Sequence, residues 1–318
     1  MGGPSVRPQA IKCIFPEPAG KVGVSGMIAG YHHKEGATPV STENAAATKM
    51  IRITDKEFLD LTTFVKSKYG IDLTKKRVLI ESRLSHELSQ RGCTSFQQYL
   101  DMVKSDQSGN EMTTMLNKLT TNLSFFMREK EHFIFLEKEV LPFFEKTRKN
   151  NEFRIWSAGC SSGQEAYNIA MLIDQYFGPR KGRWDTTILA TDISMRVLTK
   201  AQKGIYTEQE LSGLPATWRS KYLVPRPDGT FQICDKIRKE VVFRPGNLME
   251  PFHFKRPFDL IFCRNVMIYF DAPTKDSIIK KFYDWTSEGG YLFIGHSEGI
   301  GSNSRYRYVQ PAIYQRRS

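Results

Sequence analysis

The segment from Ser157 to Glu165 reads SAGCSSGQE, with two glycines, small hydroxyl residues and a closing carboxylate. Glycines let a ligand approach the backbone closely, as nucleotide-like cofactors require. The segment has neither the G-x-G-x-x-G spacing of pyrophosphate sites nor the lysine of phosphate-binding loops. Glu165 could instead accept hydrogen bonds from an amine. The alternative is an ordinary turn into a helix, whose dipole favours an acid in its first turn.

Asp192 is the second candidate binding residue, because it follows a run of β-prone residues that ends at Thr191. An acid at the tip of the second strand of an α/β sheet is placed to bind both ribose hydroxyls of a nucleoside. The alternative is that Asp192 caps the helix expected from Ser194, since Asp is a good N-cap. Its position along the chain after the glycine segment favours the binding role.

A third segment, Phe262–Phe270, places Arg264, Asn265 and Tyr269 among apolar residues at the end of a predicted strand. Open α/β sheets bind ligands at the carboxyl ends of their strands. Burying such polar groups is unfavourable unless each has a partner, which indicates a functional site. The structural alternative makes Arg264 a surface ion pair and Tyr269 a core aromatic.

A fourth segment, Leu119–Glu129, sets Asn122, Ser124 and Arg128 in an apolar frame. It bridges a helical region and the strand-containing region that follows. The alternative is a linker in which Asn122 or Ser124 caps a helix.

Strand and helix patterns alternate around these segments, and they predict a parallel α/β sheet. The expected strands are 153–159, 186–190, 240–244 and 258–263, and the expected helices are 164–177 and 194–203. The turn signal Pro227-Asp228-Gly229 lies between two extended runs, so an antiparallel β subdomain is expected at about 221–240, inserted in this domain.

The preceding region, 48–119, predicts an all-α domain. Thr54 and Glu57 form a capping-box pattern before Phe58, Leu61, Phe64 and Val65 at helical spacing. A second helix, ending at Gly92, is expected to bury Val78, Leu79, Leu84 and Leu88 and to expose basic residues. Two shorter helices, 96–104 and 111–119, complete the domain. Residues 1–47 lack a sustained period and are expected to form a flexible tail.

Composition narrows the class of protein. The chain has 318 residues, 40% of them hydrophobic, which suffices for two domains with cores. Five cysteines without C-x-x-C spacing favour reduced thiols and a cytoplasmic location, and the longest apolar run near the N-terminus, 22–29, is too short to span a membrane. The net charge of +12 suits nucleic acid, anionic lipid or an acidic protein as partner, or else serves solubility.

Taken in this order, the four segments resemble the CheR family of chemotaxis receptor methyltransferases. The resemblance covers Thr54 to Tyr314 and is most specific at 262–270 and at Gly295-His296-Ser297-Glu298. It implies an all-α N-terminal domain that recognises receptors, and a Rossmann-like methyltransferase domain, 120–318, with an inserted β subdomain. The sequence departs from the family where Gln164-Glu165-Ala166 replaces Glu-Glu-Pro and where Met127 replaces an aromatic residue.

The resemblance also implies roles for individual residues. Members transfer a methyl group from S-adenosylmethionine to glutamate side chains of chemotaxis receptors, and no metal is expected. The implied catalytic residues are Arg128, Arg264 and Tyr269. The implied cofactor contacts, which include two of these, are Asn122, Ser124, Arg128, Glu165, Asp192, Asn247, Leu248, Arg264 and Asn265.

This chemistry needs orientation more than acid–base catalysis, because a glutamate with a pKa near 4.3 is already ionised at neutral pH. Arginines and a tyrosine hydroxyl can align the carboxylate on the methyl axis. The basic helix 75–91 is expected to meet acidic receptor helices through Lys76, Arg77 and Arg83, or else to be a solvated cationic face.

Two other functions remain open at this point: a nucleic-acid methyltransferase and a non-catalytic module. The sequence lacks the Asn/Asp-Pro-Pro-aromatic motif of amino-methylating enzymes that act on nucleic acid. It also has Arg264, Asn265 and Tyr269 together, which argues against a module that has lost catalysis. No nucleic acid partner and no membrane insertion are expected, and a monomer is expected. Some members of the family bind a short peptide at the receptor C-terminus through the β subdomain. The turn at 225–229 is short relative to those members, so the resemblance implies an enzyme that does not bind such a pentapeptide. The sequence names neither the receptor nor its modified glutamates.

Overall fold

The computed structural model describes residues 51–121, 123–301 and 304–317. A twisted sheet of seven strands forms its centre, in the order β6-β2-β1-β7-β8-β10-β9. Strands β6, β2, β1, β7 and β8 run parallel, and β10 and β9 add antiparallel pairs at one edge. The strands are β1 (Ile155–Ala158), β2 (Ile188–Asp192), β6 (Val241–Pro245), β7 (Phe258–Cys263), β8 (Thr286–Ile294), β9 (Tyr306–Gln310) and β10 (Ile313–Arg316).

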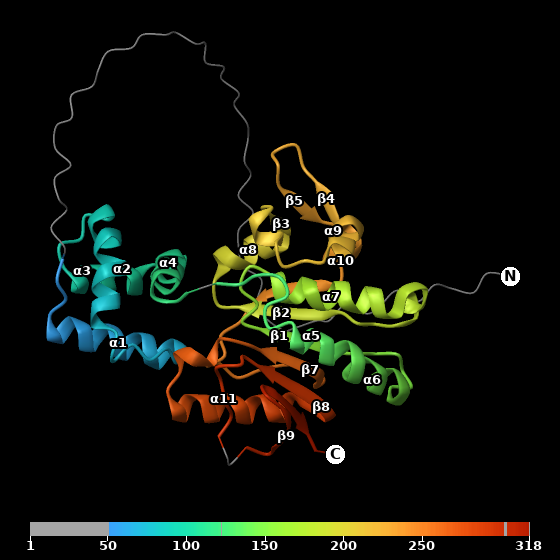
Figure 1. Cartoon of the computed structure of the whole chain (residues 1–318). Helices are drawn as coiled ribbons and strands as arrows, with labels where there is room; N and C mark the ends of the chain where they lie inside the picture. Colours follow the sequence, from blue (N-terminus) through green and yellow to red (C-terminus); the bar gives the residue numbers. More distant parts are fainter. Residues whose placement is uncertain (1–50, 122, 302–303, 318) are drawn as a thin grey trace, which may run out of the picture.

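Helices cover both faces of this sheet, and α7 and α11 lie on opposite sides of it (Figure 1). The β1 and β7 strands are buried at every position, as is usual for parallel strands between two helical layers. The helices of this domain are α5 (Glu131–Phe135), a π turn (Leu136–Val140), α6 (Leu141–Thr147), α7 (Gln164–Phe177), α8 (Met195–Lys203), α9 (Ala216–Tyr222), α10 (Asp235–Arg238) and α11 (Ala272–Trp285), with 3₁₀ turns at Gly178–Arg183, Gln209–Leu211 and Met267–Tyr269.

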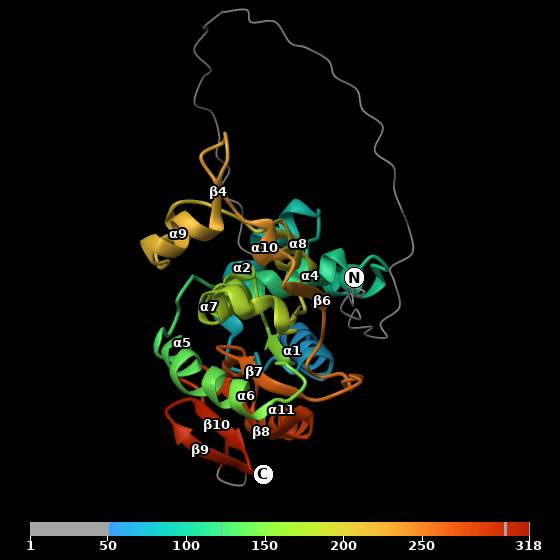
Figure 2. The same cartoon turned by 90° about the vertical axis from the view of Figure 1, so that its right-hand side faces the viewer.

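A second, three-stranded antiparallel sheet lies at the end of the molecule opposite β9 and β10 (Figures 1 and 2). Its strands are β3 (Ile205–Tyr206), β4 (Leu223–Pro225) and β5 (Phe231–Ile233), and β5 lies in the middle. The hairpin of β4 and β5 lies where the turn signal at 227–229 predicts it. The sheet also recruits β3, so it begins before the expected range 221–240.

The N-terminal region is all-α in the part that the structure describes, and it lies beside the sheet (Figure 1). Its helices are α1 (Asp55–Tyr69), α2 (Arg77–Gln90), α3 (Phe96–Ser105) and α4 (Asn110–Leu119). The predicted capping box between Thr54 and Glu57 is present, and Gly70 ends α1 with a left-handed backbone at φ 72°. The predicted combination of an all-α domain with an α/β domain is thereby confirmed.

One expectation for α2 is wrong. Val78 is 76% exposed, whereas Ile80, Leu84 and Leu88 are fully buried. The buried side of the helix therefore follows the i, i+4, i+8 spacing from Ile80, which leaves Val78 on the opposite side among basic residues. The expected tail, 1–47, lies outside the described residues.

The all-α domain and the sheet share one hydrophobic core. Leu61, Ile80 and Leu116 belong to the same buried cluster as Trp156 of β1 and Ile261 of β7. Polar contacts also join the two parts: the Asp72 N–H donates to the carbonyl of Tyr269 at 2.8 Å, and Lys66 forms an ion pair with Asp271 at 2.6 Å. The helical domain is thus fixed against the loop that follows β7.

Candidate active site

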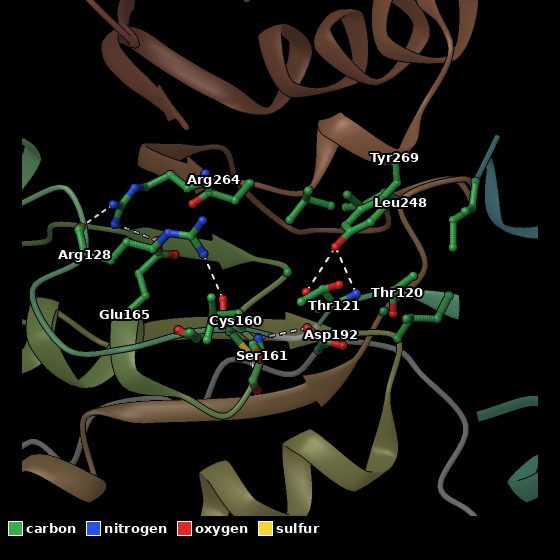
Figure 3. A pocket seen from close by; sticks show the side chains of 18 of the residues that line it. Thr120, Thr121, Arg128, Cys160, Ser161, Glu165, Asp192, Leu248, Arg264 and Tyr269 are labelled. Atoms are coloured by element: carbon green, nitrogen blue, oxygen red, sulfur yellow. Dashed lines mark hydrogen bonds and ion pairs between the residues drawn. The ribbon is translucent and has the colours of Figure 1, made fainter. Parts of the chain in front are cut away.

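A pocket opens at the carboxyl ends of β1, β2, β6 and β7, between the sheet and the end of the helical domain. Its empty space, counted out into the solvent at its open mouth, is about 1020 Å³. Residues on either side of position 122 contribute to its lining, among them Thr120, Thr121 and Arg128 (Figure 3). Of the predicted site residues, the pocket lining brings together Ser124, Arg128, Glu165, Asp192, Asn247, Leu248, Arg264, Asn265 and Tyr269. Asn122 lies outside the described residues.

The glycine segment 157–165 makes the sharp turn from β1 into α7. Gly159 has φ +84°, and a Cβ atom there would lie 2.4 Å from Cγ2 of Val266, so only glycine fits. The N–H groups of Gly159 and Cys160 both donate to the carbonyl of Thr191 at the end of β2. The turn is therefore tied to the neighbouring strand, and this opens the backbone toward the pocket.

Glu165 lies in the first turn of α7 and points into the pocket. Its carboxylate accepts hydrogen bonds from the hydroxyl of Ser157 at 2.7 Å and from the guanidinium of Arg264 at 3.1 Å. Burial raises the pKa of Glu165, and the opposing effects of Arg264 and Ser157 only partly offset this. A cation bound beside this carboxylate would favour its ionised form.

Asp192 ends β2 and organises two loops at once. One of its oxygens accepts the N–H of Ser161 at 2.8 Å, and the other accepts the N–H of Ser194 at 2.9 Å. Ser194, not Asp192, is the N-cap of α8, so the capping alternative is wrong. Burial raises the pKa of Asp192, although these backbone hydrogen bonds lower it. Each oxygen keeps a lone pair that can face the pocket.

Arg264 is buried, with only 3% of its side chain exposed. Its guanidinium donates to Glu165, to Glu129 at 3.2 and 3.3 Å, and to the backbone carbonyl of Arg128. Four of its hydrogen bonds are therefore made within the chain. The alternative of a surface ion pair is wrong, and Arg264 joins two carboxylates from separate segments.

Tyr269 lies across the pocket from Arg264 (Figure 3). Its hydroxyl donates to the carbonyl of Thr121 at 3.0 Å and accepts the N–H of Thr121 at 3.1 Å. The side chain is half-buried and lines the pocket, and it also packs against the hydrophobic core, so the alternative of a core aromatic holds in part. The hydroxyl thus binds the backbone of Thr121, directly after the helical domain.

Arg128 is half-buried and keeps donors available. One guanidinium nitrogen donates to the carbonyl of Leu123 at 2.8 Å, and the group lies 5.7 Å from the ring centroid of Phe125. Ser124 lines the pocket in irregular backbone, and the next helix starts only at Glu131, so Ser124 does not cap a helix. Leu123 and Phe125 are exposed at the mouth of the pocket, by 62% and 46%.

The remaining predicted cofactor residues hold the rim and the back of the site. Asn247 donates to the carbonyl of Lys68 in α1 at 3.0 Å, and Leu248 is nearly buried. Asn265 has φ 59°, and its side-chain amide donates to Glu129 at 3.2 Å. Such a left-handed backbone is uncommon for non-glycine residues and clusters at functional sites.

Sequence reasoning missed Glu129, which connects most of the polar groups behind the pocket. Its carboxylate accepts from Arg264, from the Asn265 amide and from the backbone N–H of His296 at 3.3 Å. Burial raises its pKa, but Arg264 and these hydrogen bonds hold it below the ordinary value. The signal that could have revealed it is its place next to Arg128, one residue beyond the segment's expected binding residues.

Glu129, His132 and His296 bring potential ligand atoms within 4.8 Å of one another. Burial, followed by the charge of Arg264, lowers the pKa of His132 to about 3, so this imidazole is neutral. The carboxylate is already used by four donors, and Arg264 places a positive charge beside it. We therefore assign Glu129 to hydrogen bonding and not to metal binding.

The three basic residues expected to meet a partner lie on one surface of α2, outside the pocket. Arg77 pairs with Asp55, and Arg83 donates to the carbonyl of Lys118 at 3.1 Å. Lys76 is exposed beside the exposed Val78. Two of the three guanidinium or ammonium groups thus also support the chain's own structure.

The polar groups that line the pocket suit a ligand that carries positive charge. Two half-buried carboxylates with raised pKa values, Glu165 and Asp192, lie in its lining, and the guanidinium of Arg264 is already neutralised by Glu129 and Glu165. A sulfonium nucleoside with an amino acid head offers a cation, an ammonium group and ribose hydroxyls. The residues present therefore fit S-adenosylmethionine.

The comparisons with known proteins point to one family along most of the chain. The family model "CheR methyltransferase, all-alpha domain" matches residues 56–120, and "CheR methyltransferase, SAM binding domain" matches residues 122–314. The chemotaxis protein methyltransferase of Borreliella burgdorferi is 42% identical over 271 residues, 84% of this chain and 96% of that protein. The one from Escherichia coli is 36% identical, over 81% of this chain and 89% of that protein. An S-adenosylmethionine-dependent methyltransferase from Mesorhizobium loti is 14% identical at a TM-score of 0.26, covering 50% of this chain and 54% of that one, which adds nothing to these matches.

Proposed function

The chain belongs to the CheR family of chemotaxis protein methyltransferases, and on that premise we propose that it methylates glutamate side chains of chemotaxis receptors. Its cofactor is S-adenosylmethionine. The observation that supports the proposal best is the meeting, in one pocket, of acids suited to a cationic cofactor with Arg128 and Tyr269, which suit a carboxylate. The product would be a glutamate methyl ester and S-adenosylhomocysteine.

S-adenosylmethionine, when bound, supplies a methyl group on a positively charged sulfur. The receptor glutamate is ionised at neutral pH, so the chain needs no general base. What its residues must do is hold a carboxylate oxygen in line and keep water away, and such positioning can supply much of the rate enhancement. Two groups of the described pocket lining that suit this task are the Arg128 guanidinium and the Tyr269 hydroxyl.

Arg128 is proposed to orient the carboxylate, because its guanidinium makes one hydrogen bond to Leu123 and lies in the pocket wall. The Tyr269 hydroxyl can exchange its bond to Thr121 for one to the substrate. Arg264 differs, since its four internal hydrogen bonds tie it to Glu129, Glu165 and the Arg128 backbone. We therefore assign Arg264 a positioning role behind the reacting groups.

The cofactor contacts are proposed from the same geometry. Glu165 would accept the ammonium group and Asp192 the ribose hydroxyls, while Asn247 and Leu248 border the adenine region. The remaining expected contacts, Asn122, Ser124, Arg128, Arg264 and Asn265, stay proposals. All of them except Asn122 line the pocket among the described residues.

The all-α domain, 48–119, is proposed to recognise the acidic helical region of the receptor. The surface of α2 that carries Lys76, Arg77 and Arg83 also exposes Val78, so it combines charge with one apolar contact. Arg83 additionally holds the carbonyls of Lys118 and Thr120, directly before the segment 121–128. Receptor contact at Arg83 would thus reach the pocket wall through one side chain.

A cytoplasmic monomer acting on receptors at the membrane is the cellular setting that we propose. None of the helices within the described residues is long and apolar enough to cross a membrane. The methyltransferase domain is proposed to span 120–318, and the pentapeptide-independent mode suggested by the short 225–229 turn is part of the proposal.

Methyl transfer from radiolabelled S-adenosylmethionine to receptor-containing membranes tests the function. We expect label on receptor that is released by mild alkali, as carboxyl esters are, and modified glutamates in a peptide map. Nucleic acid from the same cells is the matched acceptor control. Alkali-stable label, or label on nucleic acid alone, would refute glutamate esterification.

A further inference from the structure

Asn168 is a buried residue of the pocket lining whose polar groups lack partners. Its side chain is fully buried, and neither its amide nitrogen nor its amide oxygen has a hydrogen-bond partner among the described residues. Asparagine is also a poor helix former, yet it lies in the interior of α7. A buried amide with neither group satisfied destabilises a fold, and native structures contain few such groups.

The place of Asn168 explains where a partner could come from. It lies three residues after Glu165 on α7, and residues at this spacing are neighbours on one side of a helix. It lines the same pocket as Glu165, Phe133 and Arg264. The next residues of α7, Ile169 and Ala170, belong to the hydrophobic core instead. Asn168 is thus a buried, neutral polar group in the lining of the pocket.

The charges around Asn168 narrow the chemistry of its partner. Glu165 already accepts from Ser157 and Arg264, and Arg264 is already shared by two carboxylates. A zwitterionic amino acid head brings an ammonium donor and a carboxylate acceptor together. A primary amide offers one acceptor and one donor group, so it can serve either of these without adding charge.

We propose that Asn168 binds the amino acid head of the cofactor, directly or through one buried water, as a further cofactor-binding residue. The inference concerns cofactor binding, so it holds whichever acceptor the enzyme methylates. The unsatisfied amide then has a function: it is unfavourable in the empty protein and favourable in the complex.

The test uses the full chain and the variant Asn168→Leu, which removes both polar groups at similar volume. Calorimetric titrations compare S-adenosylhomocysteine with 5′-methylthioadenosine, which lacks the amino acid head. We expect the affinity for S-adenosylhomocysteine to fall about tenfold and that for 5′-methylthioadenosine to change less than about twofold. The empty variant should melt at a higher temperature than the native protein, because a buried unsatisfied amide is gone.

Met171→Leu is the matched control, since Met171 is a buried residue of the same helix that does not line the pocket. It should leave both affinities unchanged. If Asn168→Leu folds poorly, Asn168→Ala serves the same comparison of the two ligands. Equal losses for both ligands, or an unchanged affinity for S-adenosylhomocysteine, would overturn the assignment. Failure of methyl transfer to receptors would leave it standing.

Discussion

At the scale of single residues, the two pocket arginines differ in what surrounds them. Arg264 is 3% exposed between Glu129 and Glu165, whereas Arg128 is half-buried at the wall. Breaking a buried ion pair by removing one partner leaves an uncompensated charge. The two guanidinium groups should therefore respond differently to removal.

We predict that Arg264→Ala lowers the free energy of unfolding by about 3–5 kcal/mol and abolishes measurable cofactor binding. Arg128→Gln should change the unfolding free energy by less than about 0.5 kcal/mol, yet reduce kcat on receptor about 100-fold because the carboxylate loses its charge-assisted orientation. Urea denaturation and single-turnover methylation measure the two effects. Similar destabilisation by both changes would contradict the division of roles.

The pH dependence of cofactor affinity follows from Glu165. Burial raises its pKa above the ordinary 4.5, and only the ionised carboxylate attracts the ammonium group. The affinity for the cofactor therefore has its full value above the raised pKa and falls as the pH drops through it. This fall occurs at a higher pH than it would for an exposed glutamate. Calorimetric titrations of S-adenosylhomocysteine at successively lower pH, starting from neutral pH, should show this loss.

Glu165→Gln supplies the control, because it should bind more weakly and with a flatter pH profile, the remaining slope coming from Asp192, whose pKa is also raised. The empty protein behaves in the opposite sense. Since the folded state holds these protons more tightly than the unfolded state, its stability should not fall over the same pH interval on account of these two groups. A pH-independent affinity in the native protein would refute the role of Glu165.

At the scale of elements, the β1–α7 turn and the end of β7 fit together with no room to spare. The Gly159 Cα faces Val266, and a Cβ would lie 2.4 Å from that side chain at a backbone φ of +84°. The turn at 157–165 therefore packs directly against the strand end that carries Arg264 and Asn265.

We predict that Gly159→Ala lowers stability by about 1–3 kcal/mol and weakens cofactor binding, because both the left-handed backbone and the contact are unfavourable. Gly182→Ala is the control, since Gly182 has open space around it and no positive φ. Adding Val266→Ala to Gly159→Ala should restore part of the loss. Thermal melts with and without S-adenosylhomocysteine measure it, and full tolerance of Gly159→Ala would contradict the packing argument.

The proposed receptor contact at α2 leads to a second prediction at this scale. Lys76→Glu should raise the KM for receptor several-fold and reduce the salt dependence of methylation, because exposed charges act through screened attraction. Lys76 is the informative choice, since Arg77 and Arg83 also hold Asp55 and the Lys118 carbonyl. Lys280→Glu, at an exposed lysine of α11, is the matched control. Equal effects of both changes would indicate general charge attraction only.

The elements that sequence patterns predicted are those with one clear period and clear caps. The capping box of α1 and the Gly178 end of α7 lie where expected. The region 131–147 was not assigned, because the π turn at Leu136–Val140 shifts the apolar side of the helix and Pro142 interrupts the pattern. Strand β8 was obscured by Gly289 and Gly290 in its interior.

Individual site residues were easier to predict than their connections. Residue types and strand ends pointed to Glu165, Asp192 and Arg264, and all three line one pocket. The hydrogen bond from Arg264 to Glu129 joins residues that are 135 positions apart in the sequence, so no local sequence pattern predicts it. The missing partner of Asn168 is likewise visible only once every neighbour is placed.

At the scale of the whole molecule, the continuous core between the helical domain and the sheet predicts one cooperative unfolding transition. Leu61 and Leu116 share that core with Trp156 and Ile261, so neither part buries its apolar surface alone. Calorimetry should show a single peak that moves upward as a whole with S-adenosylhomocysteine. Two resolved peaks, of which only one responds to the ligand, would contradict this coupling.

The loop after α1 and the segment after α4 both meet at Tyr269: the Asp72 N–H donates to its carbonyl, and the Thr121 backbone hydrogen-bonds to its hydroxyl. The proposed receptor contact on α2 and the proposed methyl acceptor position are thereby held at a fixed separation. Such an enzyme would act as a ruler along a receptor helix. It would select a glutamate by its distance from the acidic receptor residues that bind α2. Moving the acceptor glutamate alone by one residue along the receptor sequence would abolish its methylation. Moving the glutamate and the acidic residues together would preserve it.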